Sequence, residues 1–160
     1  MSKYHVRRAD RAITDQEELD GVLSRGKFAV LAMCRDQEPY VVTMNYGYDR
    51  SRGALYFHCA HEGQKTDFVR SNPHVCGTVV EDLGYVQGEC AHEYRSVVLR
   101  GVMHVVEEPE DKRHAMDVLL NHLEDDPERV RERSLGDSRA YDRATILSLD
   151  IHDVTGKRGR

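Results

Sequence analysis

The residues best suited to chemistry lie in one short segment, from Phe57 to Asp67, which reads FHCAHEGQKTD. An apolar run ends here and a helix-like pattern begins after Gly63. The first turn of a helix has unpaired backbone amides and a partial positive charge, so a phosphate group can bind there. Lys65 would add a full positive charge, and Gly63 would let a ligand approach the backbone closely. The segment predicts a phosphate site, although a glycine and a lysine at a helix start are also common on ordinary surfaces.

Two further segments could complete such a site. The strand-like segment 39–48 could present backbone groups and apolar side chains to a flat ring, but it could equally be an ordinary core strand. Its central residues are Thr43, Met44, Asn45 and Tyr46. Arg95 begins another strand-like segment and could hold a phosphate through two parallel hydrogen bonds. The alternative for Arg95 is a plain surface arginine.

Several histidines and cysteines raise the possibility of a metal or haem site. Such ligands bind zinc and haem iron. His58 and Cys59 are adjacent on a predicted strand, so their side chains point to opposite faces and cannot both reach one metal ion. The other candidates are His61, His92 and Cys90, and none forms a ligand pair with zinc-finger spacing. We therefore expect no metal site. The sequence also has no GxSxG, Walker A or GxGxxG motif.

The elements that would position these residues are mostly strands. Six segments are rich in β-branched and aromatic residues and most are joined by short polar turns, which favours antiparallel pairing. They are 27–34, 40–48, 54–60, 74–81, 94–106 and 145–154. The first is almost continuously apolar, which predicts a strand buried on both faces or lying at a subunit contact. Gly101 predicts a bulge or bend in the long fifth strand.

Helices are predicted at three places around these strands. One begins at Thr14, which could form a capping box with Glu17, and ends at Gly26. A second covers 61–72, and a third starts at Pro109. The third carries an amphipathic stripe of Met116, Leu119, Leu120 and Leu123. Segments 82–93 and 124–138 are predicted loops, the latter with a short exposed helix. Six mostly antiparallel strands with peripheral helices predict a closed or split β-barrel, which removes exposed sheet edges.

Composition narrows the functional classes. The chain has 160 residues, 39% of them apolar, and a net charge of -5. We expect one domain over 1–160, with 1–10 and 158–160 as flexible tails. A net negative charge argues against nucleic-acid binding, and no apolar run approaches the roughly 20 residues that cross a membrane. The start of the chain has no secretory signal, so we expect a cytoplasmic protein with four free thiols.

Taken in order, these segments resemble the pyridoxamine 5'-phosphate oxidase-related FMN-binding split barrels, and within them the nitroimidazole-resistance-like branch. The resemblance is carried by PYVVTMNY at 39–46, LYFHCAHEGQK at 55–65, NPHV at 72–75, YRSV at 94–97, GVMHVVE at 101–107 and TGK at 155–157. It covers nearly the whole chain, from about residue 10 to 158.

The resemblance implies a mainly β fold, a six-stranded antiparallel split β-barrel, that binds FMN at the interface of a homodimer. It implies that the FMN phosphate binds near Lys65 and the strand end at 58–60, and that the ring lies against 42–46 and the partner subunit. Arg95 and Ser96 would contribute from the long strand. The implied cofactor-binding residues are Val42, Thr43, Met44, Asn45, Tyr46, His58, Cys59, Ala60, Gly63, Lys65, Arg95 and Ser96.

The resemblance further implies an oxidoreductase. It would pass electrons from a small-molecule donor to a small electron-poor acceptor such as a nitroaromatic, with His58 rather than His61 as the proton donor, because histidine titrates near physiological pH. Two alternatives stay open: a flavin-binding protein without turnover, and a haem-binding or haem-degrading protein on the same barrel. The ending 151–157 lacks the Arg-Leu segment of true pyridoxamine phosphate oxidases, so that reaction is not expected.

Overall fold

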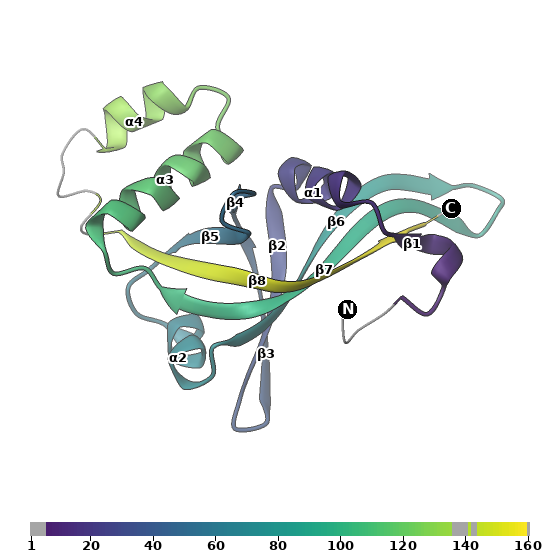
Figure 1. Ribbon diagram of the computed structural model, residues 1–160, viewed down its shortest axis with the longest axis horizontal. Helices are drawn as coiled ribbons and strands as arrows, with labels where there is room; N and C mark the ends of the chain where they lie inside the picture. The colour runs from purple at the N-terminus through teal and green to yellow at the C-terminus, as the bar shows by residue number, and fades with distance from the viewer. Residues whose placement is uncertain (1–5, 136–140, 142–143, 160) are drawn as a thin grey trace.

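Eight strands form one antiparallel sheet in the computed structural model, which describes residues 6–135, 141 and 144–159 (Figure 1). The strands are β1 (Ala12–Ile13), β2 (Phe28–Arg35), β3 (Glu38–Asn45), β4 (Gly47–Asp49), β5 (Ala54–Cys59), β6 (His74–Val86), β7 (Ala91–Val105) and β8 (Thr145–Arg158). Their order in the sheet is β3-β2-β6-β7-β8-β5-β4, and β1 pairs with β8. Of the predicted flexible tails, residues 1–5 and 160 lie outside the described part of the chain.

The sheet curls into a split barrel. Strands β3 and β4 lie at its two opposite edges, yet a single residue separates them in sequence, so the chain itself passes from one edge to the other. No ladder joins β3 to β5 among the described residues, and the barrel stays open there. When β3 and β4 are counted as one interrupted strand and the two-residue β1 as an addition, six strands make the barrel. The predicted fold class is confirmed.

Tyr46 is the residue that interrupts the predicted strand 40–48. Its side chain is fully buried and its hydroxyl donates a hydrogen bond to the Leu23 carbonyl at 2.6 Å. Burial raises the pKa of this phenol. A Cβ added at Gly47 would lie 2.8 Å from the Leu119 backbone, so a side chain here would push the helix that contains Leu119 away. The continuous strand was therefore a wrong prediction, because one side chain must turn into the core.

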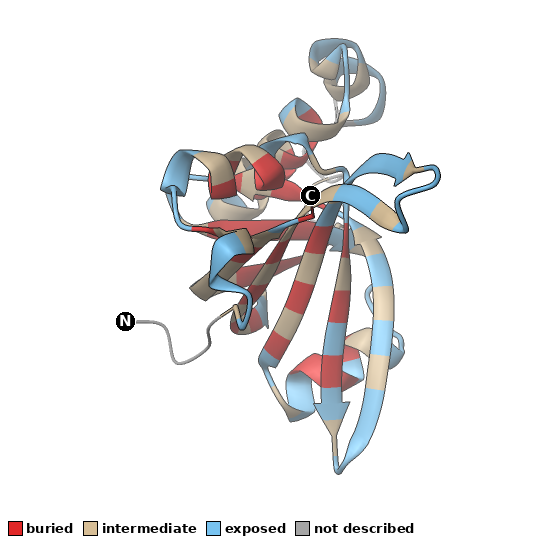
Figure 2. Ribbon diagram, turned by 90° about the vertical axis from the view of Figure 1, so that its right-hand side faces the viewer, coloured by how far each residue is buried: buried red, intermediate tan, exposed pale blue. Residues whose placement is uncertain are grey.

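Strand β2 alternates between an inner and an outer face. Ala29, Leu31 and Met33 are buried in the main core cluster, whereas Phe28 on the other face is 55% exposed. Figure 2 shows this alternation along the central strands. The predicted burial of this strand on both faces is therefore wrong within one chain. The other alternative, a contact with a second subunit, stays a prediction.

Strands β6 and β7 extend much further than the sequence indicated. They form a long hairpin closed by a turn at residues 87–90, so the predicted loop 82–93 is wrong. The prediction failed because the glycines in this segment were interpreted as loop residues. Gly84 instead follows a register shift within the ladder and has φ 108°, a backbone conformation that glycine adopts readily. The predicted bulge at Gly101 is confirmed by a register shift between Arg100 and Gly101.

Four α-helices surround the sheet in the described residues: α1 (Gln16–Arg25), α2 (Gln64–Ser71), α3 (Pro109–Leu123) and α4 (Pro127–Leu135), with a short 3-10 helix at Ala9–Arg11. The capping box predicted at Thr14 is not formed, since Asp15 is the N-cap and no side chain caps the helix. Helix α3 has Pro109 in its first turn and packs against β4 and β5, with three residues of the predicted apolar stripe buried and Leu123 half-buried. Within the described residues, no helix is both long and apolar enough to span a membrane.

Candidate functional site

The first turn of α2 has the geometry of an anion site. Gly63 precedes it with φ 146°, and a Cβ added there would meet nothing within 4 Å, so the space above the turn is open. The first helical bond runs from the Asp67 amide to the Gly63 carbonyl at 3.1 Å. The earlier amides of the turn therefore have no partner within the helix. No side chain caps them, since the N-cap residue is Gly63, and the Thr66 hydroxyl donates to the Gly63 carbonyl at 2.6 Å.

Lys65 brings its charge to this turn. Its side chain is half-buried, and within the described residues it forms no ion pair. Burial raises the pKa of the Cys59 thiol, and the Lys65 ammonium partly opposes that rise, which places the ammonium near the end of β5. The predicted association of Lys65 with the strand end is therefore present in the structure.

The end of β5 separates its side chains onto two faces. Phe57 and Cys59 pack on the inner core, whereas His58 and Ala60 are exposed. This opposition is the one that argued against a shared metal. The His61 ring lies beyond the strand, with its Nδ1 3.3 Å from the Thr145 hydroxyl. Among the described residues, no group of three or more His, Cys, Asp or Glu side chains is placed to hold a metal ion.

Strand β3 offers an edge to a flat ring. Val42 and Met44 are half-buried and pack against the core at the open side of the barrel, while Thr43 and Asn45 lie on the exposed outer face. Because β3 pairs with β2 alone in the described sheet, its backbone groups on the other side have no strand partner. Tyr46 differs from these four, since its side chain is enclosed in the core and cannot contact a ligand.

Arg95 and Ser96 do not join the other predicted residues within one chain. Helix α2 borders β7 near Met103, and Ser96 lies seven residues earlier on that strand, about 23 Å away at the usual rise of a strand. Figure 1 shows α2 beside one end of β7 and the turn of the β6–β7 hairpin at the other end. Ser96 pairs with Val80 and shares the outer face with it.

The Arg95 side chain points to the inner side of the sheet, under α1, where its guanidinium forms ion pairs with two carboxylates. Its guanidinium lies 3.4 Å from Glu18 and 3.5 Å from Glu81. Arg25 also hydrogen-bonds Glu81, and the two arginines, Arg25 first, lower the pKa of this carboxyl. Arg158 lies 3.1 Å from Glu18. Of the two residues, Ser96 is therefore the better placed to reach a ligand on the outer face.

A cavity of about 530 Å³ lies on another side of α2 and was not predicted. It is lined by His61, Val69, Arg70, Pro73, Met103, His104, Val105, Val106, Glu107, Lys112 and Thr145. These residues come from segments far apart in sequence, so no local pattern could have revealed that they meet.

Comparison with known proteins gives a family and a set of structural neighbours. A family model described as pyridoxamine 5'-phosphate oxidase matches residues 15–158. An uncharacterized protein of Rhizobium meliloti (strain 1021) is 37% identical over 89 residues, which cover 56% of this chain. The matched part spans about half of that relative, 53% of its length.

Three solved structures share the fold over most of both chains. A candidate 5-nitroimidazole antibiotic resistance protein from Bacteroides thetaiotaomicron is 24% identical, with a TM-score of 0.77 over 92% of this chain and 86% of its own. A FAD- and heme-binding protein from Mycobacterium smegmatis is 20% identical, with a TM-score of 0.77 over 94% and 74%. A FAD-binding protein from Mesorhizobium loti is 26% identical, with a TM-score of 0.66 over 94% and 97%.

Proposed function

Because the chain belongs to the pyridoxamine 5'-phosphate oxidase family, we propose that it is an FMN-binding flavoprotein that reduces a small electron-poor acceptor such as a nitroaromatic. The observation that carries the proposal is the first turn of α2. It combines open space above Gly63, amides without helical partners and the half-buried ammonium of Lys65. The amides and the ammonium are hydrogen-bond donors suited to a phosphate monoester, and the open space gives the phosphate access to them.

The remaining residues would orient the cofactor. The α2 amides and Lys65 would hold the phosphate, and the free edge of β3, beside Val42 and Met44, would hold the ring. The half-buried apolar side chains there exclude water from one face of a flat ring, and the backbone groups of the edge strand can hydrogen-bond its polar rim. When bound, the flavin supplies the electron-transfer chemistry, and the protein supplies orientation and access.

His58 is the proposed proton donor. It is exposed at the end of β5, between the core residues Phe57 and Cys59 and a few residues before the phosphate-binding turn. Its imidazole is free to approach an acceptor, because no described residue binds its ring nitrogens. His61 is less suited, since its ring lies beside Thr145 and faces the cavity.

A homodimer would complete this site. The outer face of the sheet exposes large apolar side chains, with Phe28 at 55%, Val41 at 61% and Val80 at 52%. The strand registers place all three on the same face as Thr43 and Ser96. Exposed apolar surface of this kind is typical of a protein interface. A second copy packed on this face would cover the ring and could bring its Ser96 to the flavin.

Haem binding is the second candidate, because one structural neighbour is described as binding both FAD and heme. The exposed imidazole of His58 is a possible axial ligand on the same barrel. FAD in place of FMN is a further variant of the flavin proposal, since the Mesorhizobium neighbour is described as FAD-binding.

An absorption spectrum tests the proposal directly. Purified protein is recorded alone, then after incubation with FMN, FAD or haem and removal of excess ligand. Flavin bands that stay with the protein after FMN support the proposal, and light scattering of the same sample should then give the mass of a dimer. A protein that retains neither flavin contradicts it, and a Soret band after haem addition would favour the second candidate.

A further inference from the structure

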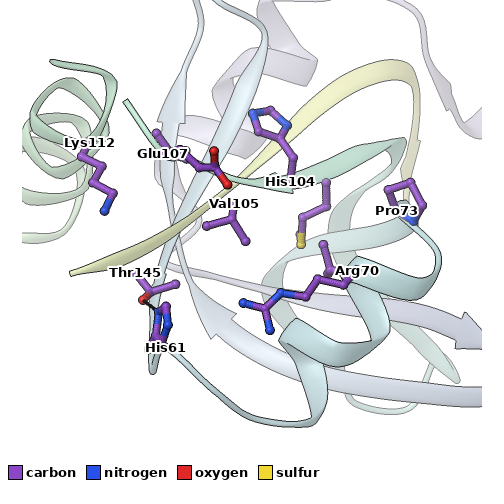
Figure 3. Close-up of a pocket in the computed structure, with 11 residues that line it drawn as sticks. His61, Arg70, Pro73, His104, Val105, Glu107, Lys112 and Thr145 are labelled. Carbon is purple, nitrogen blue, oxygen red and sulfur yellow. Dashed lines mark hydrogen bonds between the residues drawn. The ribbon is translucent and has the colours of Figure 1, made fainter. Parts of the chain in front are cut away.

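The cavity beside α2 is separate from the flavin site. Its walls come from the loop before α2, from α2, from the junction of β7 and α3, and from the start of β8 (Figure 3). Arg70 lines it, whereas Lys65 does not. Five positions along a helix correspond to a rotation of about 140°, so these two side chains leave α2 in different directions. The volume of about 530 Å³ lies in the range of small-molecule sites.

Two cations extend into this cavity from opposite walls. Arg70 comes from α2 and Lys112 from the first turn of α3, and both side chains point toward the space between the helices (Figure 3). In the described part of the chain, neither forms an ion pair. Glu107 is the one carboxylate among the described lining residues, so the permanent charges sum to a single positive charge. That excess matches a monoanion.

Two histidines and an apolar floor complete the cavity. His61 is held near the Thr145 hydroxyl, 3.3 Å from its Nδ1, and the His104 ring lies 3.7 Å from the Asp150 carboxylate. The floor consists of Val69, Pro73, Met103, Val105 and Val106. We propose that this cavity binds a small organic monocarboxylate, with its carboxylate between Arg70 and Lys112 and its apolar body on this floor. Arginine and lysine can both donate charge-assisted hydrogen bonds to such a group.

Benzoate is a suitable probe, and benzamide is its neutral counterpart of nearly the same shape. Each is titrated into the purified protein while amide shifts are followed by NMR. Benzoate should bind saturably and shift the amides of His61, Arg70 and Val105 more than those of Gly63 and Lys65. Benzamide should bind at least roughly fivefold more weakly, because it lacks the charge that the two cations contact. The readout needs no flavin, so it is independent of the proposed activity.

Two variants and one matched control test the residues. Arg70→Gln and Lys112→Gln should each weaken benzoate binding by roughly fivefold or more. Arg113→Gln removes the same charge from the next position of α3, which is exposed and does not line the cavity, and should leave binding unchanged. Equal thermal melting of the three variants and the wild type keeps the comparison free of folding effects.

Four results would overturn the proposal. The first three are no saturable benzoate binding, equal binding of benzamide, and an equal loss of affinity in all three variants. Shifts confined to Gly63 and Lys65 would also overturn it, because benzoate would then occupy the proposed phosphate site.

Discussion

Two charged regions of this protein are organised in opposite ways. Under α1, Arg25 contacts Glu81, Arg158 contacts Glu18, and Arg95 contacts both carboxylates. Around α2, the cations Lys65, Arg70 and Lys112 form no ion pair with any described residue.

This difference distinguishes charged residues that stabilise the fold from charged residues that are available to bind a ligand. A paired arginine joins two elements and has little capacity left for a ligand, whereas a cation without a partner keeps its donors for an anion from outside. Arg95 shows why the distinction matters, because its residue type alone predicted a phosphate clamp. Its surroundings instead give it the role of linking α1 to β6 and β7.

The largest expected effect is on turnover and concerns His58, at the end of β5 that leads into α2. His58→Ala should lower turnover of a nitroaromatic acceptor by about 100-fold, since a positioned general acid contributes at least this much. The yellow colour of bound flavin should remain, because the phosphate donors are untouched. His61→Ala should lower turnover far less. Equal turnover of wild type and His58→Ala, measured under steady-state conditions, would remove His58 from the mechanism.

The next effect is on FMN affinity and concerns Lys65, in the first turn of α2. Lys65→Gln should weaken FMN binding by roughly tenfold or more, since it removes a charge-assisted contact to the phosphate. Arg70→Gln is the matched control on the same helix and should leave FMN affinity unchanged, because it faces the separate cavity. Fluorescence titration of FMN measures both. A larger loss for Arg70→Gln than for Lys65→Gln would reverse the assignment of the two sites.

The smallest effect belongs to the paired region and concerns stability. The lowered pKa of Glu81 means that its ion pairs stabilise the fold above the ordinary value of 4.5 and are lost as the pH falls through the folded-state pKa. Glu81→Gln should therefore cost about 1 kcal/mol at neutral pH, and less below pH 4.5. Urea unfolding at pH 7 and pH 4 measures this. A cost that does not fall at the lower pH would contradict an electrostatic role.

Much of this fold follows from local sequence. The six barrel strands, the Gly101 bulge and the apolar stripe of α3 are visible as periodicity, turn residues and β-branched composition. The errors occur where one side chain or glycine changes the local path. Tyr46 interrupts the predicted strand because its side chain turns into the core. At Gly84 the strand continues, although a glycine there had predicted a loop.

The candidate site divides in the same way. By itself the sequence determined the glycine, the lysine and the helix start at 63–65, because these contacts lie within one turn of chain. Only the tertiary structure decided that Arg95 is paired and Ser96 is on the outer face, since both facts depend on strand register and on what packs above each side. The cavity between Arg70 and Lys112 depends on tertiary structure most of all, because its walls are brought together by folding and no stretch of sequence contains them.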